Sequence, residues 1–168
     1  MTSRRQEFKE RWLEFARIAA VCSLALVALT APVAHAGTTE RVVSDHFTGL
    51  AIGGVDPVAY FTDHQMLVGQ AEFELTAMGV VWRFCNADNR TFFQAAPQVY
   101  APQFGGYDPV DIARGVAVAG VPRLWMVHAQ RLYLFSREES RTAFAADPDQ
   151  VLHSAVARWP RVRDSLAE

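Results

Sequence analysis

The sequence predicts an α+β fold in which two tandem ββα-like units pack as one pseudo-symmetric domain, and three observations lead to this prediction. Residues 79–97 (GVVWRFCNADNRTFFQAAP) have the pattern of a strand, a polar N-cap and a helix that ends before proline. Residues 131–148 (RLYLFSREESRTAFAADP) repeat this pattern 51 residues later. Residues 53–58 (GGVDPV) likewise return as residues 105–110 (GGYDPV). Such self-similarity indicates two similar units that bury a common core.

The two copies share six identical residues in register, and their aromatic residues fall at equivalent places. Each buried ring contributes roughly 2 to 3 kcal/mol of transfer free energy, so we expect these rings to form the core. The predicted aromatic core consists of Trp82, Phe84, Phe93, Tyr133, Phe135 and Phe144.

Each unit is predicted to contain a β-hairpin. In the first unit, residues 73–76 alternate in polarity and pair with the β-branched and aromatic run at 80–84. In the second unit, residues 125–128 pair with residues 131–135. The apolar residues 58–61 are interpreted as a strand or a tight turn.

Helix signals are clearer in the second unit. Asp108 is expected to cap a short helix that has Pro109 at its first position. Residues 136–139 (SREE) have the pattern of a capping box. A last helix is expected to begin after Asp147, to cover the hairpins with one apolar face, and to end at Pro160.

The N-terminal residues 1–36 have the layout of a secretory signal peptide. Basic residues precede an apolar run at 18–33 that is shorter than the roughly 20 residues of a membrane-spanning helix. We therefore expect a periplasmic or secreted protein, with an uncleaved anchor in the inner membrane as the alternative. The pattern leaves open whether the protein is exported by the Sec route or by the twin-arginine route.

The rest of the chain divides by composition. We expect a flexible lead-in at 37–49, a first unit at 50–104, a second unit at 105–160 and a polar tail at 161–168.

Composition argues against several classes of function. After residue 36 the chain has 11 Arg and no Lys against 15 Asp and Glu, and it contains no basic run. Nucleic-acid binding needs clustered cations, so it is not expected. Contact with a membrane is expected only through the signal segment before its cleavage. Cys85 is the one cysteine after residue 36, which excludes an intramolecular disulfide in the mature chain.

The order of these motifs resembles the YHS domain. Residues 100–107 (YAPQFGGY) are similar to the exported bacterial subgroup of that family, and the likeness covers roughly residues 53–159. The other matching residues are Asp56, Pro57, Val58, Trp82 to Cys85, Arg90, Phe93 and Pro97.

For YHS domains attached to metal transporters, the resemblance implies a heavy-metal site made of cysteines. Cys85 is the only one of these cysteines that this chain keeps, whereas a closed tetrahedral thiolate site needs about four soft ligands. The other corresponding positions carry Ala59, Asn89, Asp108, Asp111, Ser136 and Ser140.

Cys85 has two interpretations. A position at a helix N-terminus would lower its pKa and make it a reactive thiol or a soft ligand for copper or zinc. His128, His64 or His46 would then be its partners. The alternative, which we favour, is a small buried hydrophobic residue, because a lone cysteine is commonly of that kind.

The two DP aspartates and the two equivalent arginines also have alternatives. Asp56 and Asp108 would form a paired carboxylate for acid–base chemistry, or each would cap a turn before proline, which is the simpler account. Arg90 and Arg141 are expected to pair with carboxylates across the unit interface rather than to clamp an anion.

Three classes of function follow, and the sequence favours the first. The chain contains no Ser–His–Asp, phosphate-loop, Rossmann or HExxH motif, so an enzyme that uses Cys85 or the carboxylates is the least favoured class. A periplasmic copper-type metal-binding protein would use Cys85 and His128. The favoured class is a non-catalytic binding module of the cell envelope, for a small ligand or a protein partner. Its cleft between the two halves would be lined by Tyr60, Trp82, Tyr107, Asp56 and Asp108.

Overall fold

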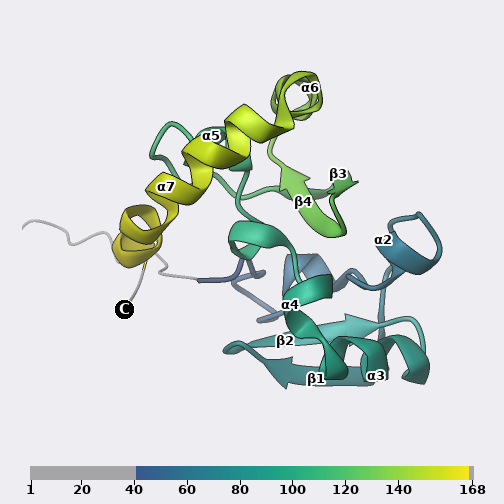
Figure 1. Cartoon of the computed structure of the whole chain (residues 1–168). Helices are drawn as coiled ribbons and strands as arrows, with labels where there is room; N and C mark the ends of the chain where they lie inside the picture. Colours follow the sequence, from purple (N-terminus) through teal and green to yellow (C-terminus); the bar gives the residue numbers. More distant parts are fainter. Residues whose placement is uncertain (1–40, 167–168) are drawn as a thin grey trace, which may run out of the picture. The chain divides into compact units, whose positions relative to one another are not determined.

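The structure is a computed structural model that describes residues 41–166. The predicted signal peptide, the first residues of the lead-in and the last two residues of the chain lie outside this range. The α+β class is confirmed, because the described residues form two separate two-stranded antiparallel sheets together with helices (Figure 1). No helix in this part of the chain has both the length and the apolar character needed to cross a membrane.

The first hairpin pairs β1 (Gln70–Ala77) with β2 (Val80–Phe84), as predicted. Leu75 lies opposite Trp82. The first strand begins at Gln70, earlier than predicted, and its pairing register with β2 shifts between Gln70 and Glu74. Met78 and Gly79 form the turn, both in the left-handed region, at φ 55° and 80°.

A helix follows this hairpin where the sequence predicts it. The Asn86 side chain caps α3 (Ala87–Ala95) by accepting a hydrogen bond from the Asn89 N–H at 2.8 Å. The helix ends before Pro97, where the one-turn helix α4 (Pro97–Tyr100) begins.

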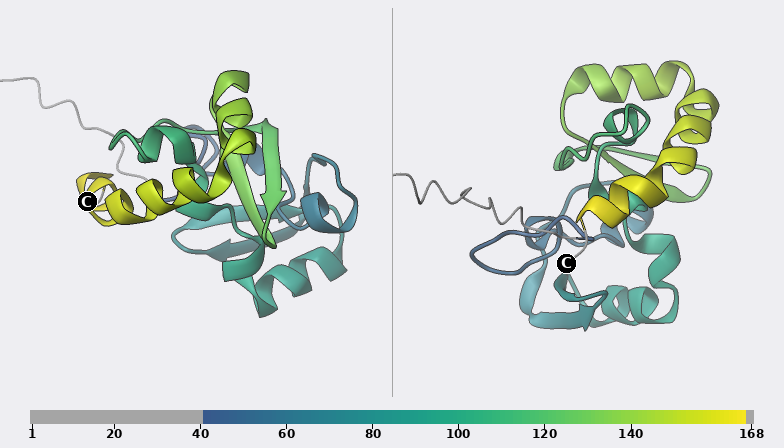
Figure 2. Two further views of the ribbon diagram at one scale, coloured as in Figure 1. Left: turned by 45° about the horizontal axis from the view of Figure 1, so that its top comes forward. Right: turned by 90° about the vertical axis from the view of Figure 1, so that its left-hand side faces the viewer.

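The second hairpin pairs β3 (Val121–His128) with β4 (Arg131–Phe135), again as predicted. Met126 lies opposite Tyr133, and the register is irregular between Val121 and Trp125. Helix α6 (Glu138–Ala146) follows. It packs against β3 and β4, on the side of the structure opposite to β1, β2 and α3 (Figure 2).

Short helices lead into both hairpins. Residues 58–61 belong to a turn and the one-turn helix α2 (Ala59–Thr62), which rules out the strand alternative. Helix α5 (Pro109–Ile112) has Asp108 as its N-cap, and this carboxylate accepts a hydrogen bond from the Val110 N–H at 2.9 Å, as predicted. Two 3-10 turns, η1 (Ile52–Gly54) and η2 (Gln103–Gly106), complete the leads.

Two helix boundaries differ from the prediction. Helix α7 (Pro148–Leu166) continues through Pro160, so residues 161–166 are helical rather than a polar tail. Ala155 before this proline and Val162 after it are both buried, and this packing outweighs the backbone hydrogen bond that proline removes. The capping box at 136–139 is wrong. The N-cap of α6 is Arg137, whose side chain does not cap the helix, and the Ser136 hydroxyl donates to Asp108 instead.

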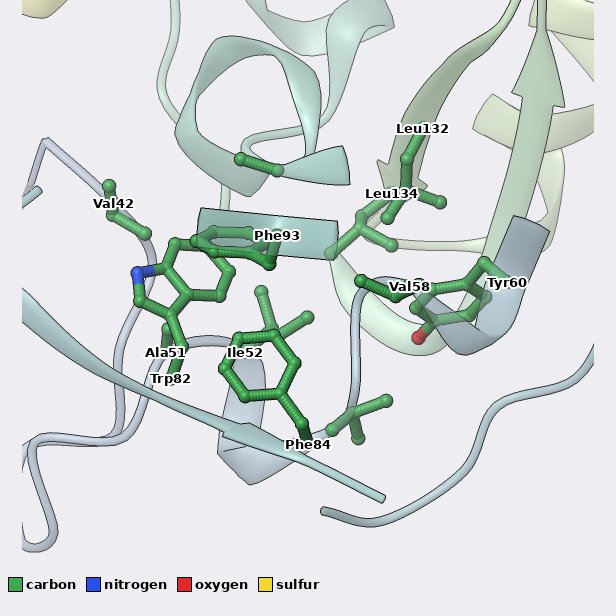
Figure 3. Close-up of a cluster of buried hydrophobic side chains, with 12 residues drawn as sticks. Val42, Ala51, Ile52, Val58, Tyr60, Trp82, Phe84, Phe93, Leu132 and Leu134 are labelled. Atoms are coloured by element: carbon green, nitrogen blue, oxygen red, sulfur yellow. The ribbon is translucent and has the colours of Figure 1, made fainter. Parts of the chain in front are cut away.

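The predicted aromatic core is confirmed, since all six rings are buried. Trp82, Phe84 and Phe93 form one cluster, in which Trp82 and Phe93 lie 4.8 Å apart between ring centres. Leu132 and Leu134 of β4 belong to the same cluster, so the second hairpin closes the core of the first (Figure 3). Two further buried clusters lie around Phe135 with Phe144 and around Ile112 with Ala155.

The described end of the lead-in is held by the fold rather than loosely attached. Val42 is buried in the first cluster. The Val43 N–H donates to the Gly105 carbonyl at 2.8 Å, and the Val43 carbonyl accepts from the Ile52 N–H at 2.9 Å. The sequence prediction missed this attachment because polar residues surround a single Val pair.

Candidate ligand-binding site

Asp56 is a fully buried carboxylate whose two oxygens join two segments. Oδ1 accepts the Val58 N–H at 2.8 Å, in the turn before α2. Oδ2 accepts the Cys85 N–H and the Asn89 amide, each at 2.7 Å, at the start of α3. This carboxylate therefore holds the DP turn against the end of β2.

Asp108 has the same role in the second half. It is fully buried, and Oδ2 accepts the Ser136 N–H at 2.8 Å while Oδ1 bonds to the helix that Asp108 caps. No hydrogen bond between Asp56 and Asp108 is recorded in the described residues, and each carboxylate is occupied by its own half. The geometry supports the capping interpretation over paired acid–base chemistry.

A third carboxylate, Asp111, extends this network in the second half only. Arg137 binds both of its oxygens, at 2.7 and 2.9 Å, and the Ser136 hydroxyl lies 3.3 Å from Oδ2. These hydrogen bonds, above all the one from Arg137, lower the pKa of Asp111. Sequence reasoning did not single out Arg137, whose one signal is its position directly after the residue that Asp108 holds.

Cys85 does not have the environment of an activated thiol. Asn86 caps the helix, so Cys85 lies before the cap, and its Sγ contacts the Val68 carbonyl at 3.6 Å. Burial and the nearby negative charges of Asp56 and Asp63 raise the pKa of Cys85 to about 11. The raised pKa argues against the activated-thiol interpretation, and the partly buried side chain is not the buried hydrophobic residue of the interpretation that we favoured.

The predicted metal ligands are not gathered into a metal-binding group. Within residues 41–166, no three or more His, Cys, Asp or Glu side chains are placed to hold a metal ion. The His128 ring instead packs edge-on against Phe144, with ring centres 5.9 Å apart. His64 borders a cavity, and His46 lies exposed in the lead-in.

Of the three aromatic residues predicted to line one cleft, Tyr60 and Trp82 share a buried cluster and Tyr107 lies in another. Tyr60 is fully buried, and its hydroxyl donates to the Pro122 carbonyl at 2.8 Å. Trp82 is buried in the first core cluster, with its indole N–H donating to the Ala77 carbonyl at 3.0 Å. Tyr107 belongs to another cluster. Tyr60 and Trp82 border different cavities, so the three rings do not line the one cleft that the sequence predicted.

Tyr60 nevertheless borders a cavity that residues of both halves surround, which we call the aromatic cavity. Its volume is about 640 Å³. The ring of Trp125 lies 4.9 Å from that of Tyr60, tilted by 55°. Among the lining residues are Tyr60, Phe61, His64, Trp125, Gln130 and Arg141.

Polar side chains stand beside the aromatic rings of this cavity, namely those of His64, Gln130 and Arg141. Arg141 supplies a positive charge and pairs with Glu138 within α6, so the predicted pairing across the units is wrong for this residue. His64 and Gln130 both have left-handed backbones, at φ 56° and 59°, although neither is glycine. Non-glycine residues in this region carry conformational strain, which is often found at binding sites. The arrangement suits an apolar ring with an acidic substituent.

Comparison with known proteins found no matching family model, no similar curated protein and no similar solved structure.

Proposed function

We propose that this chain is an exported, non-catalytic binding module of the cell envelope, of the YHS-domain kind, that binds a small organic ligand in the aromatic cavity. One observation carries the proposal. Residues within 60–64 and 125–141, which are distant in the sequence, line a single open cavity of about 640 Å³. That volume lies within the roughly 300 to 1,000 Å³ of small-molecule sites, and such sites combine aromatic or aliphatic side chains with a few placed polar groups, as Trp125 and Arg141 are combined here.

The proposal includes a pseudo-symmetric arrangement of two tandem units. Supporting it, the pairs Leu75–Trp82 and Met126–Tyr133 are equivalent at an offset of 51 residues. Gly69 and Gly120 are also equivalent. A Cβ on the first would lie 2.5 Å from the Arg83 backbone, and one on the second 2.6 Å from the Leu134 side chain. Both halves thus need glycine at the same point of the hairpin.

The occupied carboxylates support a non-catalytic role. A general base must have a lone pair available to its substrate, whereas the oxygens of Asp56 and Asp108 accept structural hydrogen bonds. The raised pKa of Cys85 keeps the thiol protonated near neutral pH and so disfavours nucleophilic catalysis and metal ligation by this residue.

The cavity favours a ligand with an aromatic ring and a carboxylate. The ring would stack on Trp125, since offset and tilted aromatic pairs are attractive. The carboxylate would accept hydrogen bonds from Arg141, whose present partner Glu138 is more than half exposed and easily displaced.

Titration of the purified protein with simple aromatic carboxylates and their uncharged amides tests the proposal. We expect saturable binding in isothermal titration calorimetry, and at least a tenfold weaker affinity in Trp125→Ala. The matched control is Phe92→Ala, which removes a half-exposed ring from the far side of α3. Arg141→Gln should weaken binding of the acids but not of the amides. Binding that survives Trp125→Ala unchanged, or no binding by any compound of the panel, would reject the proposal.

Export is tested separately by fractionating cells that express the full chain. We expect a periplasmic form whose intact mass corresponds to a chain that begins at Gly37. A membrane-bound form with the mass of the full chain would show that the N-terminal segment is not cleaved and would support the anchored alternative.

A further inference from the structure

A second cavity of about 640 Å³ lies between α7 and the loop that follows α5, and arginine dominates its lining. Arg114 of the loop and Arg158 and Arg161 of the helix surround it, and Val162 and Ser165 complete the wall. We call this the arginine cavity. It shares no lining residue with the aromatic cavity.

The guanidinium groups of this cavity lack sufficient negative partners. Arg158 and Arg161 form no ion pair with any residue that the structure describes. Arg114 lies 3.4 Å from Asp111, but Arg137 already binds both oxygens of that carboxylate. Like charges repel one another, so a group in which two arginines lack a negative partner and the third shares one favours a bound anion.

The end of helix α7 does not account for these arginines. A helix C-terminus attracts cations mainly within its last turn. Arg163 occupies that turn and lies 3.2 Å from Asp164. Arg158 and Arg161 stand earlier in the helix, beyond the effective reach of this attraction.

The floor of the arginine cavity is firmly packed. Val162 is buried together with Ile112 and Ala155, which fixes α7 against α5. Arg158 lies over Gly115, where a Cβ would be 3.7 Å from its Nη1 atom. The backbone that carries Arg158 and Arg161 is therefore fixed, while their side chains are exposed and accessible to an anion.

We propose that the arginine cavity binds a phosphate group, carried either by a small soluble molecule or by a lipid headgroup. Guanidinium groups present planar pairs of N–H donors that match phosphate oxygens, and three of them at one site neutralise a doubly charged group. The proposal does not depend on the ligand of the aromatic cavity.

Titration of the purified full-length protein with inorganic phosphate, followed by NMR of backbone and arginine side-chain N–H groups, tests the first source. Vesicles of phosphatidylglycerol, with phosphatidylcholine vesicles as the reference, test the second by co-sedimentation. The test variant is Arg158→Gln/Arg161→Gln. The control is Arg90→Gln/Arg123→Gln, which removes the same charge from residues that form no ion pair in the described chain.

We expect saturable binding that weakens at least tenfold in the test variant and less than twofold in the control. Shifts centred on Gly115 and Arg158 with inorganic phosphate would assign a soluble phosphate. Sedimentation with anionic vesicles alone would assign a lipid headgroup. Equal binding by both double variants, or no binding to either probe, would overturn the proposal. Unfolding temperatures within about 2 °C of wild type would confirm that both variants are folded.

Discussion

Ser136 donates both its backbone N–H and its hydroxyl to a single oxygen of Asp108, each at 2.8 Å. This contact holds the end of β4 to the turn that starts α5. A buried carboxylate that satisfies backbone donors leaves them unpaired when it is changed, and that is costly.

Asp108→Asn should therefore destabilise the protein strongly. We expect a loss of about 3 kcal/mol in the free energy of unfolding, because an amide cannot accept on both sides and at least one buried N–H loses its partner. Urea denaturation followed by circular dichroism measures the change. Ser136→Ala is the control, with an expected loss of about 1 kcal/mol, since only the hydroxyl bond is removed. Equal losses in the two variants would contradict this account.

The Cys85 thiol should react slowly in the folded protein. At pH 8, labelling by a thiol reagent is expected to be at least tenfold slower than for a free cysteine, because the pKa of Cys85 is raised to about 11. In urea the labelling rate should return to the ordinary value. Fast labelling of the folded protein would show that the thiol is activated after all.

The same shift makes stability depend on alkaline pH. A pKa raised on folding stabilises the protein below the ordinary thiol pKa, and this contribution is lost as the pH rises from about 9 to about 11. The buried tyrosines also titrate at high pH, so the test is the difference between wild type and Cys85→Ser. We expect that difference to change across this interval and to be flat below it.

Asp111 should give stability with the opposite pH dependence. Its pKa is lowered by Arg137, so its contribution is present above pH 3.8 and is lost as the pH falls below that value. Arg137→Gln should lower the unfolding temperature at pH 7 and have a smaller effect at pH 3. Thermal scans at both values measure this. A loss that is independent of pH would assign Arg137 a role in packing only.

The turn of the second hairpin should be open to stabilisation. Ala129 and Gln130 both have left-handed backbones, at φ 47° and 59°, where Asn and Gly are the favoured residues. Ala129→Asn/Gln130→Gly is expected to add about 1 kcal/mol to the free energy of unfolding, which corresponds to roughly 4 °C. The control is Met78→Asn, which lies in the first hairpin beside a turn glycine already present and should add less.

The repeat allowed most elements to be predicted from the sequence. Hairpin pairing and the aromatic core depend on local patterns that both copies show, and the cap at Asp108 is a local signal as well. The continuation of α7 through Pro160 could not be predicted, because it rests on burial of Val162 against α5, which is a tertiary contact.

The candidate site was less accessible from the sequence. The structure places Tyr60 beside a cavity other than the predicted cleft, and Trp125 and Arg141 join it only through the folding of β3 and α6. The Ser136 hydroxyl likewise donates to Asp108 and does not cap the helix that follows it, because Asp108, which is distant in the sequence, lies within hydrogen-bond distance. Sequence patterns assign capping roles to single segments and do not include such competition between segments.

Leu132 and Leu134 sit in the same buried cluster as Trp82. During synthesis or export the N-terminal half appears first, and its hydrophobic core therefore cannot be completed until β4 is present. The apolar residues of the N-terminal half must remain exposed, or be covered by other proteins such as chaperones, until about fifty further residues have followed. We therefore expect the two segments to fold together as one cooperative unit. Neither segment should be stable when it is produced alone.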